Sequence, residues 1–268
     1  MTIPFYKYQA TGNDFVLIDN RQNLYDGLTT AQVARLCDRR FGIGGDGLML
    51  LNNKAGYDFD MKYYNSDGRE GSMCGNGGRC IAQFARHLDV IGDKAIFTAV
   101  DGEHIATLQK DNWVRLRMNP VHEVKQEGDH FILNTGSPHY VVQVENVDSV
   151  NVPRDGAAIR YSPTFAAKGI NVNFVQVKED GGIYVRTYER GVEDETYSCG
   201  TGVTAAALVV AAAHVAAEKQ AVSKVDVQTL GGNLSVEFNK VNDQDFEDIW
   251  LCGPATLVFK GEISIDGI

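Results

Sequence analysis

Short runs of β-branched and aromatic residues, bounded by Gly, Asn or Asp, recur along most of the chain. This pattern favours strands over helices, because branched and aromatic side chains fit a pleated surface and the flanking residues suit turns. We therefore expect strands at residues 15–19, 57–64, 114–118, 140–144, 172–177, 183–188 and 250–259.

Three other stretches repeat their apolar residues at the spacing of a helix. The first is Thr30–Arg40, for which Thr29 or Thr30 is a natural N-cap. The second, Asn76–Leu88, carries an apolar stripe. The third, residues 202–219, is apolar on nearly every side. A helix without a polar face is buried all round, so we expect the strands to wrap it.

The chain repeats the same landmarks in the same order. A Cys-Gly-x-Gly motif opens a helix at Cys74 and again at Cys199, and a Thr-containing turn ending in Gly follows each helix. A tryptophan-led strand ending in proline comes next, at 113–120 and at 250–254. A long-range repeat of this kind indicates two similar halves.

We therefore predict an α+β fold of two pseudo-symmetric domains, each a mostly antiparallel strand layer wrapped round a central buried helix. The N-terminal half is expected to span residues 1–119 and to carry Cys74, with the last residues, 260–268, packing back on it. The C-terminal half, residues 120–259, carries Cys199.

Composition narrows the class of protein. The 268 residues include 35 Asp and Glu against 25 Lys and Arg, and this net charge of −10 argues against nucleic-acid binding. The N-terminus lacks the basic stretch and apolar run of a signal peptide, and the most apolar segment, 203–217, is shorter than the about 20 residues of a membrane span. The odd number of cysteines, five, suits a reducing compartment. We expect a cytoplasmic protein with neither nucleic acid nor membrane as partner.

The repeated motif places each of two cysteines at the start of a helix. Such a position exposes unpaired N–H groups and a partial positive charge, which favour a thiolate and an anionic ligand. The adjacent glycines allow a ligand to approach the backbone closely. Two such thiols facing each other across a domain cleft suit inversion at a carbon centre, where one removes a proton and the other returns one.

Other interpretations of these cysteines predict different patterns. A nucleophilic enzyme needs one cysteine with a base, a redox pair is usually C-x-x-C, and zinc needs closely spaced ligand pairs. The chain has two equivalent cysteines, no C-x-x-C, and no cysteine or histidine pair at the spacing of zinc ligands. We therefore expect no metal site. A free cysteine is most often a small buried residue. Cys37, Cys80 and Cys252 lack the Cys-Gly-x-Gly context, and we interpret all three as packing residues.

The sequence resembles the diaminopimelate epimerase family over essentially its whole length. These are enzymes that use two cysteines, without pyridoxal phosphate, to interconvert LL- and meso-2,6-diaminopimelate, a precursor of lysine and peptidoglycan. The resemblance rests on these motifs: Thr11-Gly-Asn-Asp-Phe-Val16, Gly42-Ile-Gly-Gly-Asp-Gly47, Asn65-Ser-Asp-Gly68, Met73-Cys-Gly-Asn-Gly-Gly-Arg-Cys80, Gly136-Ser-Pro-His139, Asn171-Val-Asn-Phe174, Tyr188-Glu-Arg-Gly191 and Cys199-Gly-Thr-Gly202.

The resemblance implies a role for each matching residue. Cys74 and Cys199 would be the two acid–base groups, and His139 and Glu189 would tune or orient the thiols. The reacting carboxylate would be held by Gly75, Asn76, Gly200 and Thr201. The distal amino-acid end would be bound by Asn13, Asn65, Asn171, Glu189 and Arg190. The resemblance also implies no cofactor, and a homodimer.

The chain departs from the family pattern at two places. Ser137 stands where the family commonly has Asn, so any substrate contact from that Asn is missing or replaced. Gly47 stands where some members have Gln, so we assign it no side-chain contact.

Purely structural interpretations of these predicted substrate contacts remain open. Asn13 and the Asn65–Gly68 stretch also suit turns, His139 also suits a structural histidine, and Arg190 also suits a solvated charge. Alternative functions are a racemase of proline or another simple amino acid, a thiol-based redox protein, and an amino-acid-binding protein without catalysis.

Overall fold

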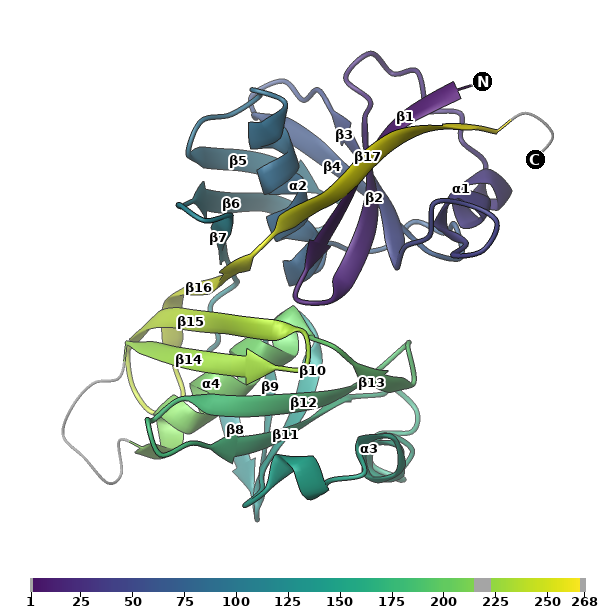
Figure 1. Cartoon of the computed structure of the whole chain (residues 1–268). Coiled ribbons are helices and arrows are strands. Elements are labelled where there is room, and N and C mark those ends of the chain that lie inside the picture. The colour runs from purple at the N-terminus through teal and green to yellow at the C-terminus, as the bar shows by residue number, and fades with distance from the viewer. Residues whose placement is uncertain (1, 215–222, 266–268) are drawn as a thin grey trace. The chain divides into compact units, whose positions relative to one another are not determined.

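In the computed structural model, which describes residues 2–214 and 223–265, the chain forms two compact units (Figure 1). Unit 1 runs to Leu116 and resumes at Gly253, and unit 2 is Arg117–Cys252. The chain thus leaves the first unit three residues before the predicted boundary at 119. The returning segment is also longer than the predicted 260–268, of which residues 266–268 lie outside the described residues.

Unit 1 is built from strands and the helices α1 and α2. Its elements, in chain order, are β1 (Thr2–Ala10), β2 (Asn13–Asp19), α1 (Thr30–Cys37), β3 (Gly47–Asn52), β4 (Phe59–Asn65), α2 (Gly75–His87), β5 (Lys94–Ala99), β6 (Gly102–Leu108), β7 (Trp113–Arg117) and β17 (Thr256–Ser264). Its strands pair in the order β17–β1–β2–β3–β4–β5–β6–β7.

Unit 2 repeats this plan with α3 and α4. Its elements are β8 (Val124–Glu127), β9 (His130–Asn134), β10 (Pro138–Gln143), η1 (Val147–Ser149), α3 (Val152–Arg160), β11 (Asn171–Val177), β12 (Ile183–Glu189), β13 (Asp194–Thr196), α4 (Gly200–His214), β14 (Lys224–Thr229), β15 (Gly232–Lys240) and β16 (Phe246–Pro254). Its strands pair in the order β8–β9–β10–β11–β12–β14–β15–β16, and β13 adds to one end of β12.

The two orders match pair by pair. The parallel pairs are β2–β3 and β4–β5 in unit 1 and β10–β11 and β12–β14 in unit 2, and the remaining pairs in both orders are antiparallel. Parallel neighbours need a crossover connection, and helices supply it at the same places: α1 and α2 in unit 1, α3 and α4 in unit 2. The predicted α+β fold of two pseudo-symmetric halves is confirmed.

Each unit wraps its strands around one central helix. Helix α2 packs against β1, β2, β3, β6 and β17, and α4 packs against β9, β10, β11, β12, β14 and β15 (Figure 1). The apolar side chains of α4 from Val203 to Ala211 belong to one core. This burial confirms the expectation drawn from its lack of a polar face. Residues 215–219 of the predicted helix lie outside the described residues.

Local sequence signals account for the starts of α1 and α3. Thr29 is the N-cap of α1 and forms a capping box with Gln32. Helix α3, which the sequence analysis missed, begins after Asn151, whose side chain accepts a hydrogen bond from the Arg154 N–H. Gly156 within α3 weakens the helical pattern, but a Cβ there would lie 2.4 Å from Tyr188 Cβ.

One predicted strand is wrong in its extent. The run from Trp250 to Phe259 divides at Ala255 into β16 and β17, which belong largely to different units. An unbroken run of strand-forming residues does not reveal which partner each part pairs with, because β16 pairs with β15 and β17 with β1.

Candidate active site

Cys74 is the N-cap of α2, and Cys199 directly precedes α4. Each cysteine carbonyl accepts a hydrogen bond from the N–H four residues on, Gly78 at 2.8 Å and Val203 at 2.8 Å. The Cys74 Sγ also accepts from the Gly77 N–H at 3.3 Å. Each sulfur therefore lies at the positive end of a largely buried helix, which favours its ionised form.

The second glycine of each Cys-Gly-x-Gly motif makes room for these groups. A Cβ at Gly77 would lie 3.3 Å from Cys74 Sγ, and one at Gly202 would lie 2.4 Å from Asn173 Oδ1. The second glycine of each motif is therefore required by packing.

His139 connects the interior of unit 2 to Thr201, next to Cys199. Its Nε2 lies 2.9 Å from Thr201 Oγ1, which in turn lies 3.4 Å from Cys199 Sγ. On the other side of the ring, His139 Nδ1 lies 3.1 Å from Asn173 Nδ2.

The partners of Asn173 decide which ring nitrogen carries the proton. Asn173 Nδ2 donates to the Tyr140 carbonyl at 3.0 Å, and Asn173 Oδ1 accepts from the Thr187 hydroxyl at 3.0 Å. The amide nitrogen is therefore the donor towards His139 Nδ1, and a neutral ring must carry its hydrogen on Nε2. Burial, with the charge of Arg190 adding to it, lowers the pKa of His139 to about 3. The ring is thus a neutral donor to the Thr201 hydroxyl.

A second cluster in unit 2 joins Ser137, Asn171 and Arg190. Asn171 Oδ1 accepts from the Arg190 backbone N–H at 2.9 Å, and Asn171 Nδ2 donates to Ser137 Oγ at 2.9 Å. The Arg190 guanidinium donates to the same Ser137 oxygen at 3.3 Å. Nearby in sequence, Glu189 Oε2 accepts from the Thr196 hydroxyl at 3.0 Å. Ser137 therefore joins the two predicted contacts Asn171 and Arg190.

In unit 1 the structure brings Asn13 and Asn76 together. Asn76 Nδ2 donates to Asn13 Oδ1 at 3.2 Å. Asn76 Oδ1 accepts from the guanidinium of Arg79 at 3.0 Å, and that guanidinium also donates to the Thr11 hydroxyl at 3.3 Å. Arg79 is fully buried on α2. The sequence analysis gave it no role, although a cation on the buried face of a helix after Cys-Gly-Asn-Gly is a signal of one.

The remaining predicted residue of unit 1, Asn65, ends β4 and begins a turn closed by the Gly68 N–H on the Asn65 carbonyl at 2.9 Å. The strand registers show which residue of unit 2 holds the position that Asn65 holds in unit 1. Gly47 pairs with Asn65, and the β11–β12 register, continued by one residue, sets Asn171 opposite Glu189. Asn65 and Glu189 thus hold equivalent positions. A Cβ at Gly47 would lie 2.5 Å from Tyr63, which explains the glycine there.

The remaining cysteines, Cys37, Cys80 and Cys252, are buried. Burial raises the pKa of Cys37 to about 12 and also raises that of Cys80. The thiols of Cys37 and Cys80 therefore pack in the cores and do not ionise near neutral pH. Over residues 2–214 and 223–265, His, Cys, Asp and Glu form no cluster of three or more suited to a metal. Within the same residues, no helix is both long and apolar enough to span a membrane.

Comparison with known proteins identifies one family over most of the chain. The diaminopimelate epimerase family profile matches residues 5–124 and 131–258. The diaminopimelate epimerase of Flavobacterium psychrophilum is 47% identical, covering 96% of this chain and 99% of the relative. That of Chlorobaculum tepidum is 41% identical over the same shares, 96% and 99%.

Solved structures with low sequence identity share the fold. A PhzF-family phenazine biosynthesis protein from Bacillus anthracis superposes with a TM-score of 0.72 at 16% identity, covering 99% of this chain and 100% of that one. A probable proline racemase from Agrobacterium radiobacter superposes with a TM-score of 0.67 at 16% identity, covering 98% and 93%.

Proposed function

The chain belongs to the diaminopimelate epimerase family, and from this premise we propose that it interconverts LL- and meso-2,6-diaminopimelate with Cys74 and Cys199 as a two-base pair. The observation that carries the proposal is the equivalence of the two cysteines. Each stands at the N-terminus of the buried helix that lies between the equivalent parallel partners, β4 and β5 in unit 1 or β12 and β14 in unit 2.

The chemistry follows from two thiols of similar environment. One thiolate takes the α-proton and becomes a thiol, while the opposite thiol gives its proton to the other face of the same carbon. General acid–base catalysis of this kind accelerates a reaction by about 10²–10⁴-fold. The rest of the rate depends on stabilising the carbanion and the adjacent carboxylate. Backbone N–H groups at Gly75, Asn76, Gly200 and Thr201 are suited to that carboxylate.

We assign the distal end of the substrate to Asn13, Asn65, Asn171, Glu189 and Arg190. A distal amino acid carries both a carboxylate and an ammonium, so it needs a fork-shaped cation and several acceptors. Arg190 supplies the cation, and its contacts with Ser137 and the Lys168 carbonyl, at 3.3 and 3.1 Å, support it in one orientation. Glu189 and the amide oxygens supply acceptors.

Within unit 2 we assign His139 the orientation of the Cys199 thiol through Thr201. Because the ring is a neutral Nε2–H donor, it is not the base that ionises the sulfur. It occupies one lone pair of the Thr201 hydroxyl, which turns the hydroxyl hydrogen towards Cys199 Sγ at 3.4 Å. A hydrogen bond from a hydroxyl stabilises a thiolate more than a thiol.

The test is proton NMR of LL-diaminopimelate in deuterated water. Wild type should yield the meso form with deuterium at the inverted α-carbon, and Cys74→Ala and Cys199→Ala should each lose epimerisation. Cys37→Ala is the matched control, because that buried cysteine has no place in the mechanism. Full-rate epimerisation by either of the first two variants contradicts the two-base scheme.

Three further measurements separate the alternative functions. Turnover of proline in preference to diaminopimelate would favour a racemase of simple amino acids. Tight binding of diaminopimelate without inversion would favour a binding protein. A disulfide found in protein taken from growing cells would favour a redox role.

We further propose a cytoplasmic homodimer. The odd number of cysteines, five, suits a reducing compartment, and Val258 and Phe259 leave apolar surface exposed on β17. Light scattering after gel filtration should give the mass of two chains, and cell fractionation should place the protein with cytoplasmic markers. A one-chain mass contradicts the dimer.

A further inference from the structure

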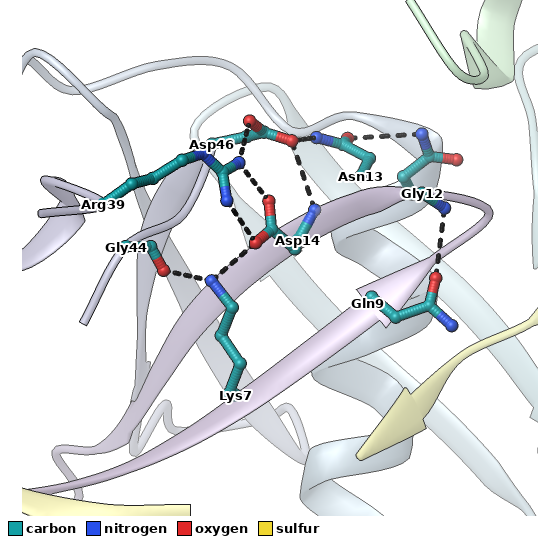
Figure 2. Close-up of polar contacts among 9 residues, drawn as sticks. Lys7, Gln9, Gly12, Asn13, Asp14, Arg39, Gly44 and Asp46 are labelled. Carbon is teal, nitrogen blue, oxygen red and sulfur yellow. Dashed lines mark hydrogen bonds and ion pairs between the residues drawn. The ribbon is translucent and has the colours of Figure 1, made fainter. Parts of the chain in front are cut away.

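Asp46, at the end of the glycine-rich loop 42–47, holds the side chain of Asn13 (Figure 2). Its Oδ2 accepts from Asn13 Nδ2 at 2.5 Å and from the Asp14 N–H at 3.2 Å. Its own N–H donates to the Asp14 carbonyl at 2.7 Å. The loop and the start of β2 are thus joined by backbone and side-chain contacts together.

These contacts extend into a directed chain of side chains. Asp46 accepts from Asn13, Asn13 accepts from Asn76 at 3.2 Å, and Asn76 accepts from Arg79 at 3.0 Å. A carboxylate at one end only accepts, and a guanidinium at the other end only donates. Each amide between them therefore has one favourable orientation. A reversed Asn13 would set its NH₂ against that of Asn76, donor against donor.

Asp46 is itself anchored by neighbouring charges (Figure 2). The Arg39 guanidinium donates to Asp46 Oδ1 at 2.9 Å and to both oxygens of Asp14, at 2.6 and 2.9 Å. Lys7, which is buried, lies 2.7 Å from Asp14 and also donates to the Gly44 carbonyl of the loop. Burial works to raise the pKa of Asp14, but hydrogen bonds from Arg39 and Lys7 lower it to about 2. Asp14 therefore stays ionised at neutral pH and keeps its contacts with both cations.

We propose that Asp46 is a positioning residue for the Cys74 half of the site, which fixes the orientation of the Asn13 amide and, through it, of Asn76. The inference rests on the proposed function in taking Asn13 and Asn76 as substrate contacts. Asn76 lies two residues after Cys74 on α2. Rotation of its side-chain amide would exchange the donor and the acceptor that it presents to a ligand beside the thiol.

The first test is NMR of side-chain amides in the substrate-free protein. Asp46→Asn keeps the size of the side chain but replaces a carboxylate, which only accepts hydrogen bonds, with a neutral amide that also donates. The NH₂ signals of both Asn13 and Asn76 should shift, with the backbone spectrum otherwise close to wild type. Asp26→Asn is the matched control, because Asp26 accepts from Asn20 Nδ2 at 2.7 Å in the same unit. It should leave the Asn13 and Asn76 signals unchanged.

The second test is kinetic. Loss of a charged hydrogen bond should lower kcat/KM for diaminopimelate by about 10- to 100-fold in Asp46→Asn, and Asp26→Asn should keep it near wild type. Asp46→Ala should fall at least as far, and the melting temperature of each variant shows that it is folded. Unshifted amides, or shifted amides with unchanged kcat/KM, overturn the positioning role.

The two tests fail independently. A wild-type protein that leaves diaminopimelate unchanged overturns the proposed function, even where the amide signals of Asp46→Asn shift. A wild-type protein that epimerises normally, with an Asp46→Asn variant that matches it in amides and rate, overturns the inference alone.

Discussion

The neutral imidazole of His139 donates from Nε2 to the hydroxyl of Thr201 at 2.9 Å, and this bond links a fully buried ring to the helix end beside Cys199. The link depends on Asn173, whose amide nitrogen occupies the other ring nitrogen at 3.1 Å. We propose that this hydroxyl donates a hydrogen bond to the Cys199 sulfur, 3.4 Å away, while the ring stays neutral.

Replacing Thr201 with valine removes that hydroxyl and keeps the side-chain shape. We expect kcat to fall about 10-fold, the size of one lost hydrogen bond, and the pH dependence of Cys199 alkylation to move to higher pH. Thr204→Val, the same change one turn along α4 at a hydroxyl that donates to the Gly200 carbonyl at 3.0 Å, is the control. Equal alkylation profiles for Thr201→Val and wild type contradict the link.

His139 makes stability depend on pH in a defined direction. Its pKa is lowered from 6.5 to about 3 in the folded state, so between these values the unfolded chain binds a proton that the folded chain does not. The free energy of unfolding should therefore fall as pH drops from about 6.5 towards 3. Urea titrations at pH 7 and pH 5 should show a larger loss for wild type than for His139→Gln. A loss of equal size in both proteins would mean that the ring takes up a proton in the fold.

Gly202 is required by close packing against Asn173. An alanine there would bring Cβ within 2.4 Å of Asn173 Oδ1. We expect Gly202→Ala to lower the free energy of unfolding by about 1–3 kcal/mol and to disturb the His139 ring signals. Gly27→Ala is the control, because nothing lies within 4 Å of a Cβ at Gly27. Urea unfolding measures the stability of both variants. A Gly202→Ala protein as stable as wild type would show that the helix end tolerates a side chain.

Arg190 should matter for substrate more than for folding. Arg190→Gln keeps a donor but loses the charge and the fork, so we expect a drop of about 10- to 100-fold in kcat/KM for diaminopimelate, carried mainly by KM. The melting temperature should change little. The control is Arg154→Gln, which removes an exposed ion pair with Asp155 at 2.7 Å. Equal kinetics for the two variants would remove Arg190 from the distal contacts.

Much of the fold could be predicted because its elements depend on residues that are close together in the sequence. The capping residue of α1, the apolar surface of α4 and the two Cys-Gly-x-Gly motifs each depend on neighbours within a few positions. The repeat was visible for the same reason, since both halves carry the same local signals in the same order. Helix α3 was missed because Gly156 breaks its pattern, and the reason for that glycine is Tyr188, far along the chain.

The sequence by itself determined that two cysteines begin two buried helices in a repeated α+β plan. Only the tertiary structure decided which polar groups support them. Arg79, Asp46 and Asn173 gain their roles from partners on other strands and loops, and the division of β16 from β17 follows from which strand each part pairs with. Helix starts depend on neighbouring residues, whereas the orientation of an amide or the proton of a ring depends on atoms that meet only when the chain has folded.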